Sequence, residues 1–150
     1  MHIYVDADAF PNAIKELLFR ASERKSVPVT FVAGQYVRVP KSDLLFSVAV
    51  PEGADAADHK IVGMIEEGDL AITADIPLAA RVVEKKAFAL NPRGEFYTEE
   101  NVKQKLAMRN FMEEMRSAGE ITGGPKSFAQ KDRQQFANAL DRFLTQHVKQ

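Results

Sequence analysis

The chain lacks cysteine, long apolar runs and a strong net charge, and each absence excludes a class of site or of protein. None of the 150 residues is cysteine, which excludes disulfides, thiolate zinc sites and a cysteine nucleophile and indicates a reducing compartment. No stretch approaches the roughly 18 consecutive apolar residues that a membrane span needs. We therefore expect a cytoplasmic protein that has no membrane partner.

The charge is balanced in total but uneven along the chain. A formal net charge of -1 argues against a generally basic nucleic-acid coat. Residues 1–100 nevertheless carry 11 Lys and Arg against 16 Asp and Glu, whereas residues 101–150 carry 9 against 5. A basic C-terminal third beside an acidic body fits a polyanionic partner that also needs metal ions, although charges also scatter unevenly by chance.

Length and hydrophobic patterning predict a single domain over residues 1–150. A hydrophobic content of 45% is enough to build a full core. Short apolar runs predict five strands, at residues 3–5, 27–33, 44–50, 70–73 and 87–90. Helical spacing predicts helices between most of these runs, the first over residues 11–24. Strands that alternate with helices are typical of a parallel sheet with helices on both faces.

The C-terminal third has a different pattern. Thr98 is placed to cap a long helix that runs to about Arg116, and residues 132–148 have the spacing of a last helix. A loop containing Gly123 and Gly124 separates the two. We expect both helices to pack onto the sheet as part of the same domain.

Five aspartates follow predicted strands or begin the helices after them. They are Asp6, Asp8, Asp55, Asp58 and Asp75. In open α/β sheets, ligands bind beyond the carboxyl ends of the strands. Clustered carboxylates repel one another unless a cation is present, and hard oxygen ligands in an open site suit Mg²⁺ or Mn²⁺. The sequence thus predicts a metal site formed by these five residues, with Asp6, Asp58 and Asp75 as the catalytic ones.

Each acid also has a structural alternative. Asp75 and Asp55 are placed to cap the helices that follow them, and Asp8 could hold a turn through an Asx-type hydrogen bond. Asp6 and Asp58 are harder to explain in this way, because one directly ends an apolar strand and the other lies on an apolar helix stripe. Aspartate 69 begins its strand, so it belongs at the opposite edge of the sheet and is not included.

Cations and glycines near the same edge predict contacts to substrate phosphates. The predicted substrate-binding residues are Lys15, Arg81, Arg93, Gly123, Gly124 and Lys126. Simpler roles exist for all of them, since cations line solvated helix faces and a turn between two helices also needs glycine. The three histidines show no spacing typical of metal ligands.

Several segments taken together resemble the bacterial YaiI/YqxD family. They are residues 5–11, 53–58, 68–79, 91–94 and 122–125, with the sequences VDADAFP, GADAAD, GDLAITADIPLA, NPRG and TGGP. That family is itself uncharacterised and is grouped with the PIN-like and NYN-type metal-dependent ribonucleases. The resemblance implies a three-layer α/β/α fold with a central five-stranded parallel sheet of order 3-2-1-4-5, plus C-terminal helices.

The same resemblance implies roles for individual acids. Asp6 matches the first acid of PIN-like nucleases, Asp55 and Asp58 match the acids at the start of a mid-chain helix, and Asp75 matches the acid of the Thr-x-Asp signature. Two departures matter. Phe10 stands where many family members have cysteine, and the glutamate that PIN nucleases place on an earlier helix has no aligned counterpart here. Either Asp8 substitutes for that glutamate or the site is degenerate.

Three hypotheses follow for the function. The leading one is a Mg²⁺- or Mn²⁺-dependent hydrolase of phosphodiester bonds, with RNA as the substrate. A second is a phosphatase of the haloacid-dehalogenase type, because Asp6-Ala7-Asp8 also resembles the nucleophile and acid pair of those enzymes. The third is a non-catalytic module that binds nucleic acid or a nucleotide. The sequence leaves the oligomeric state open.

Overall fold

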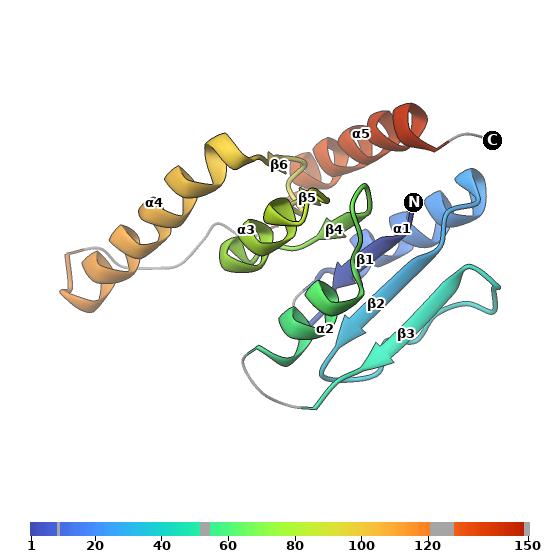
Figure 1. Ribbon diagram of the computed structural model, residues 1–150, viewed down its shortest axis with the longest axis horizontal. Helices are drawn as coiled ribbons and strands as arrows, with labels where there is room; N and C mark the ends of the chain where they lie inside the picture. The colour runs from blue at the N-terminus through green and yellow to red at the C-terminus, as the bar shows by residue number, and fades with distance from the viewer. Residues whose placement is uncertain (9, 52–54, 121–127, 149–150) are drawn as a thin grey trace.

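A six-stranded sheet with helices on both faces forms the centre of the computed structural model (Figure 1). The structure describes residues 1–8, 10–51, 55–120 and 128–148. In chain order its elements are β1 (Ile3–Asp6), α1 (Asn12–Lys25), β2 (Val29–Ala33), β3 (Leu45–Ala49), α2 (Ala56–Met64), β4 (Leu70–Ile72), α3 (Ile76–Glu84), β5 (Phe88–Leu90), β6 (Phe96–Tyr97), α4 (Glu99–Ser117) and α5 (Gln130–His147).

The sheet is mostly parallel, and its strand order is β3-β2-β1-β4-β5-β6. Neighbouring strands from β3 to β5 pair in parallel, whereas β6 pairs with β5 antiparallel. The predicted α/β class is confirmed. The predicted sheet of five parallel strands is wrong, because the chain turns back at residues 91–95 and adds a sixth strand. Central β1 has β2 on one side and β4 on the other, so its carboxyl end is flanked by two loops.

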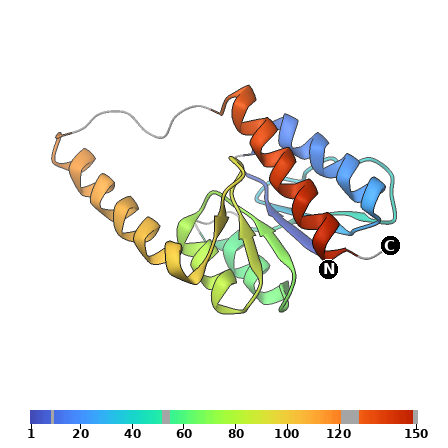
Figure 2. The same ribbon diagram turned by 90° about the horizontal axis from the view of Figure 1, so that it is seen from above.

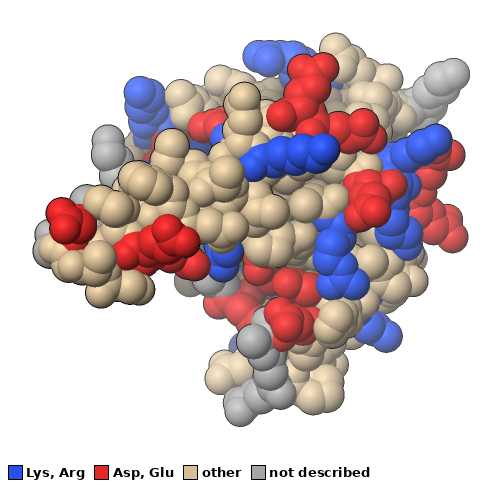
Figure 3. All heavy atoms as spheres, turned by 60° about the vertical axis from the view of Figure 1, so that its left-hand side comes forward, with Lys and Arg blue, Asp and Glu red and all other residues tan. Residues whose placement is uncertain are grey.

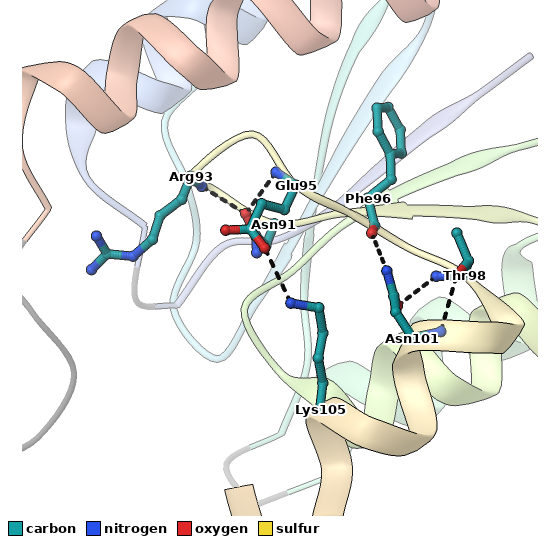
Figure 4. A network of polar contacts seen from close by, with 7 residues as sticks. All are labelled: Asn91, Arg93, Glu95, Phe96, Thr98, Asn101 and Lys105. Carbon is teal, nitrogen blue, oxygen red and sulfur yellow. Dashed lines mark hydrogen bonds and ion pairs between the residues drawn. The ribbon is translucent and has the colours of Figure 1, made fainter. Parts of the chain in front are cut away.

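The turn that leads into β6 is held by side chains as well as backbone. The side-chain oxygen of Asn91 accepts hydrogen bonds from the backbone N–H groups of Arg93 (2.9 Å) and Glu95 (3.1 Å), as Figure 4 shows. Asn101 donates to the carbonyl of Phe96, at 3.0 Å, from the first turn of α4. A strand of two residues, as β6 is, carries no periodic pattern, so it is defined by its pairing with β5 and by these contacts.

Alternate residues of the central strands point into two cores, one on each face of the sheet. Ile3 and Val5 lie in a core shared with α1 and α5, and Tyr4 lies in the opposite core with α2 and α3. Helices α1 and α5 run side by side over the first face (Figure 2). The sheet is thus covered on both faces, which leaves its carboxyl edge as the open side of β1.

The two C-terminal helices behave differently. Helix α5 packs onto the sheet as expected, with Phe136 and Leu144 fully buried in the first core. Helix α4 does not, which corrects the expectation: it touches α3 near its start and then runs away from the body of the molecule (Figures 1 and 2). Val102 is its only buried residue within the described chain. The apolar stripe of Met108, Phe111, Met112 and Met115, which are at helical spacing, stays exposed or half-exposed. No helix in the described ranges is long and apolar enough to cross a membrane.

Candidate acidic site at the sheet edge

The carboxyl edge of the sheet opens onto a cavity of about 720 Å³. Four carboxylates line it, those of Asp6, Asp8, Asp58 and Asp75. They come from the ends of β1 and β4 and from the starts of α2 and α3, as expected for a parallel sheet. The molecular surface viewed from this side has a group of acidic side chains close together in the lower part of Figure 3. The structure therefore brings the three residues predicted as catalytic to one cavity.

Thr73 links the first and last of these acids. Its buried hydroxyl donates to Oδ2 of Asp6 at 2.9 Å and accepts from the backbone N–H of Asp75, also at 2.9 Å. The residue follows β4 directly, beside the end of β1, because the two strands are paired. Asp6 and Asp75 are thus held in a fixed relation by one threonine side chain.

The predicted capping role of Asp75 is also present. Its Oδ1 accepts from the backbone N–H of Leu78 at 3.0 Å, and Pro77 follows in the first turn of α3. Such a carboxylate at a helix N-terminus is favoured by the helix dipole. Capping uses one carboxylate oxygen, so this role is compatible with a ligand on the other.

Asp58 is the most perturbed of the four. It lies on the buried side of α2, next to Ala57, and only 8% of its surface is exposed. Burial, and then the negative charges of Asp75, Asp6 and Asp55, raise the pKa of Asp58 to about 6, although the Arg81 guanidinium acts in the opposite direction. A substantial fraction of Asp58 is therefore protonated near pH 6.

The pKa of Asp6 is raised by the same kinds of effect. Burial is the largest cause, and the charges of Asp75 and Asp8 add to it, while the hydrogen bond from Thr73 opposes them. The pKa values of Asp6 and Asp58 are thus both raised, and the charge of Asp6 is one of the causes of the shift at Asp58. Such repulsion marks a place where positive charge is stabilising.

The remaining two predicted metal ligands are Asp8 and Asp55, and neither is linked to Asp6 and Asp75 by Thr73. Asp8 accepts a hydrogen bond from the backbone N–H of Gly34 at 2.8 Å, which ties the end of β1 to the loop after β2 instead of closing a local Asx turn. Asp55 occupies the N-cap position of α2 without a side-chain capping bond and is exposed. Its charge reaches Asp58, but it is not one of the residues that line the cavity.

The acids do not form a closed metal cage. Within the described ranges, no group of three or more His, Cys, Asp or Glu side chains is placed to hold a metal ion. Asp6, Asp8 and Asp75 each use one carboxylate oxygen in a hydrogen bond, and in the described part of the chain the other oxygen has no such partner. This donor set fits an open site of the Mg²⁺ type, in which one or two carboxylates bind the ion and water or a substrate phosphate completes its shell.

The predicted substrate-binding cations are dispersed. Lys15 of α1 lines the cavity. Arg81 lies 3.3 Å from Nδ1 of His59 and acts on Asp58 through its charge. Arg93 forms an ion pair with Asp132 of α5 at 2.7 Å. Of the other predicted contacts, Gly123, Gly124 and Lys126 lie outside the described residues.

The loop after β2 supplies cavity residues that the sequence analysis missed. Gln35, Tyr36 and Arg38 line the cavity beside the acids, together with Asn12 from the start of α1. The available signal was Gly34, which ends β2 as Asp6 ends β1, since parallel neighbouring strands end at the same edge. Thr73 was also missed, although it stands two residues before Asp75 in the Thr-x-Asp segment.

Comparisons with known proteins place this chain among its relatives. A family model described as "Uncharacterized BCR, YaiI/YqxD family" matches residues 4–146. The chain belongs to this family. A YaiI/YqxD relative named UPF0178 protein from Hahella chejuensis is 58% identical over 149 residues, which is 99% of each chain. One from Shewanella sp. (strain MR-7) is 60% identical over 142 residues, 95% of this chain and 93% of the relative.

A third relative has a slightly lower sequence identity. The UPF0178 protein from Maridesulfovibrio salexigens is 54% identical over 148 residues, covering 99% of this chain and 98% of its own. No solved structure matches. The names of these YaiI/YqxD relatives state no activity.

Proposed function

We propose that the protein is a Mg²⁺- or Mn²⁺-dependent hydrolase of phosphodiester bonds that acts on RNA, with Asp6, Asp58 and Asp75 at its centre. The observation that carries the proposal is the convergence of Asp6, Asp58 and Asp75 on one cavity at the carboxyl edge of the sheet. The raised pKa of Asp58, to about 6 through burial and the neighbouring carboxylates, agrees with it. A divalent cation is the ligand that relieves this repulsion most directly. RNA supplies phosphate oxygens, which complete the shell of such an ion.

The roles of the residues follow from how they are held. The Thr73 hydroxyl and the N-terminus of α3 fix Asp6 and Asp75, so that their second oxygens are available to a cation without a change of side-chain conformation. When bound, the ion would supply an activated water and neutralise charge on the phosphate. Asp58 loses its proton as the pH rises above about 6 and then contributes a full negative charge.

Two further considerations support this assignment. The chain resembles the PIN-like and NYN-type metal-dependent ribonucleases at Asp6, Asp58 and Asp75, and we propose membership of that superfamily on this basis. Lys15 provides a cation on the cavity wall for a substrate phosphate. Arg93 is a weaker candidate, because its ion pair with Asp132 already accounts for its position.

The test is cleavage of a labelled single-stranded RNA by the purified protein in Mn²⁺, Mg²⁺ or EDTA. We expect Asp6→Asn and Asp75→Asn to lower the cleavage rate at least about 100-fold, the effect expected when a preorganised charge is removed from a site. Asparagine still accepts the Thr73 and Leu78 hydrogen bonds, so the fold should persist. Asp43→Asn is the matched control, because Asp43 is exposed and precedes β3, at the edge of the parallel sheet opposite to the acids.

Three results would contradict the proposal. They are no cleavage in either metal, cleavage that EDTA leaves unchanged, and asparagine variants as active as the wild type. Metal-dependent binding without cleavage would favour the non-catalytic module instead. A beryllium fluoride adduct on Asp6 would favour the haloacid-dehalogenase type of phosphatase.

A further inference from the structure

We infer that Tyr36, together with Lys15 and Arg38 of the same cavity, forms a subsite on which an unpaired base of a single-stranded nucleic acid stacks. The inference deepens the proposed function and rests on it for the position of the phosphate next to that base. It concerns the wall of the cavity formed by α1 and by the loop after β2, none of whose residues is an acid of the proposed catalytic set.

Tyr36 exposes an unusually large aromatic surface. Its exposed fraction is 69%, the highest among the large hydrophobic side chains of the described chain. The other exposed large hydrophobics, Met1, Phe46, Met108 and Phe111, do not line the cavity. An aromatic ring open to solvent in a polar cavity offers a face for stacking, and every base has a complementary face.

The backbone on both sides of Tyr36 is fixed. The N–H of Gly34 donates to Asp8 at 2.8 Å, and the N–H of Val37 donates to Oγ of Ser47 on β3 at 3.1 Å. The side chain of Val37 is buried in the core shared with α1. The ring is therefore presented from an ordered loop, so that little conformational entropy is lost when a base packs on it.

Two cations that line the same cavity as Tyr36 can bind the phosphates of the nucleic-acid backbone. Lys15 projects from α1 and Arg38 from the same loop as Tyr36, and both line the cavity. Neither is in an ion pair within the described part of the chain. An aromatic platform flanked by cations is the usual composition of surfaces that bind single strands without strong sequence preference. Asn12 and Gln35 add groups that can hydrogen-bond to base edges.

The sheet order separates this subsite from the acids that Thr73 links. Tyr36 follows β2 and Asp75 follows β4, and these strands flank β1 on opposite sides. A single-stranded nucleic acid that crosses the end of β1 can thus place a phosphate at the acids and a neighbouring base on Tyr36. The bases of a duplex are already stacked on one another and offer no free face, so the subsite selects single strands.

The experiment measures equilibrium binding of a short labelled single strand by fluorescence anisotropy, in Ca²⁺ and without Mg²⁺ or Mn²⁺, so that the strand is not cleaved during the measurement. We expect Tyr36→Ala to weaken binding roughly 5- to 150-fold, the range for loss of one base–aromatic stack. Tyr36→Phe should bind like the wild type, because the ring and not the hydroxyl makes the contact. Phe111→Ala is the matched control, since Phe111 is an exposed aromatic residue on α4.

A second readout reports stacking itself. The chain contains no tryptophan, so Tyr36→Trp introduces a single indole whose fluorescence should be quenched when a base stacks on it. RNA and DNA strands of one sequence form separate arms, and quenching by both identifies the base as the shared ligand. A duplex of the same sequence should bind more weakly and quench less.

Failure of this inference is distinguishable from failure of the proposed function. If strands bind and are cleaved but Tyr36→Ala binds as tightly as the wild type, the subsite is overturned and the hydrolase remains. If binding depends on Tyr36 but no strand is cleaved in Mn²⁺ or Mg²⁺, the subsite stands and the hydrolase is overturned. The subsite is also overturned if no single strand binds or if the duplex binds equally well.

Discussion

At the scale of single residues, Asp58 is a carboxylate whose charge changes near pH 6. Its pKa is raised to about 6, which means that the folded protein holds this proton more tightly than the unfolded chain does. Asp58 places an ionisable group on the buried side of α2, where an apolar residue would pack without this cost. A residue that lowers stability is a reasonable candidate for a functional one.

Asp58→Asn should make the metal-free protein more stable, and the gain should depend on pH. Below about pH 4 the aspartate is protonated in both states, so the two proteins should be equally affected by pH. Between about pH 4 and 6 the unfolded chain releases the proton first, so wild-type stability falls as the pH rises. The gain of the variant should level off above about pH 6, at on the order of 1 kcal/mol after solvent screening.

Urea unfolding of both proteins from pH 4 to pH 8 checks this prediction. Addition of Mn²⁺ at pH 7 should stabilise the wild type more than the variant, because a bound cation offsets the charge that the variant lacks. A stability difference that is constant over the whole pH range would contradict the role assigned to Asp58.

Thr73 gives a second prediction at this scale. Thr73→Val removes the hydroxyl that joins Asp6 to the backbone of Asp75, and leaves that part-buried N–H without its acceptor. We expect a loss of about 1–3 kcal/mol in the free energy of unfolding. Thr73→Ser keeps the hydroxyl and should lose about 1 kcal/mol or less, the value of one buried methyl. Equal losses in urea unfolding would show that packing, and not the hydrogen bonds, is what Thr73 contributes.

At the scale of elements, the turn between β5 and β6 docks directly on α5. Gly94 in this turn has a φ of +91°, and a Cβ added there would lie 2.6 Å from the carbonyl oxygen of Gln135. Arg93 reinforces the same contact through its ion pair with Asp132. The sixth strand thus connects the sheet to the last helix, although β6 itself has only two residues.

Substitutions at Gly68 and Gly94 distinguish the cost of backbone strain from the cost of disturbing the contact with α5. Gly68 has a similar φ of +87° but no atom within 4 Å of an added Cβ. Gly68→Ala should therefore cost only the left-handed conformation, about 1–2 kcal/mol. Gly94→Ala should cost about 2 kcal/mol more, because the backbone of α5 must move. Thermal unfolding of the two variants measures the difference, and equal costs would mean that α5 moves without penalty.

At the scale of the whole molecule, the features that could be predicted are those that leave a local pattern in the sequence. Ile3, Tyr4 and Val5 identify the central strand, and Asp6 and Asp75 follow strands, so strand direction alone brought them to one edge. Tyr36 lies in a loop without periodicity, and β6 is too short to have one. The position of α4 was wrong because its apolar residues are sufficient for a helix but do not specify a partner surface.

The C-terminal helices should differ in their contribution to global stability. Phe136 of α5 is fully buried in the core shared with β1, whereas Phe111 of α4 is 53% exposed. Phe136→Ala should cost about 3–5 kcal/mol, and Phe111→Ala should stay within about 0.5 kcal/mol. Hydrogen exchange of β1 amides under both substitutions provides the measurement. An unchanged exchange rate in Phe136→Ala would mean that α5 and the N-terminal strands unfold separately, against the single domain predicted from the sequence.

The projecting helix also affects how the protein moves through solution. Helix α4 has 19 residues, a length of about 28 Å, and most of it stands clear of the body (Figure 2). Friction with water grows with elongation, so a chain of 16.7 kDa with such an arm migrates in gel filtration like a heavier sphere. An early elution volume is therefore the ordinary behaviour of one molecule, and sedimentation equilibrium, which is independent of shape, is the method that counts subunits.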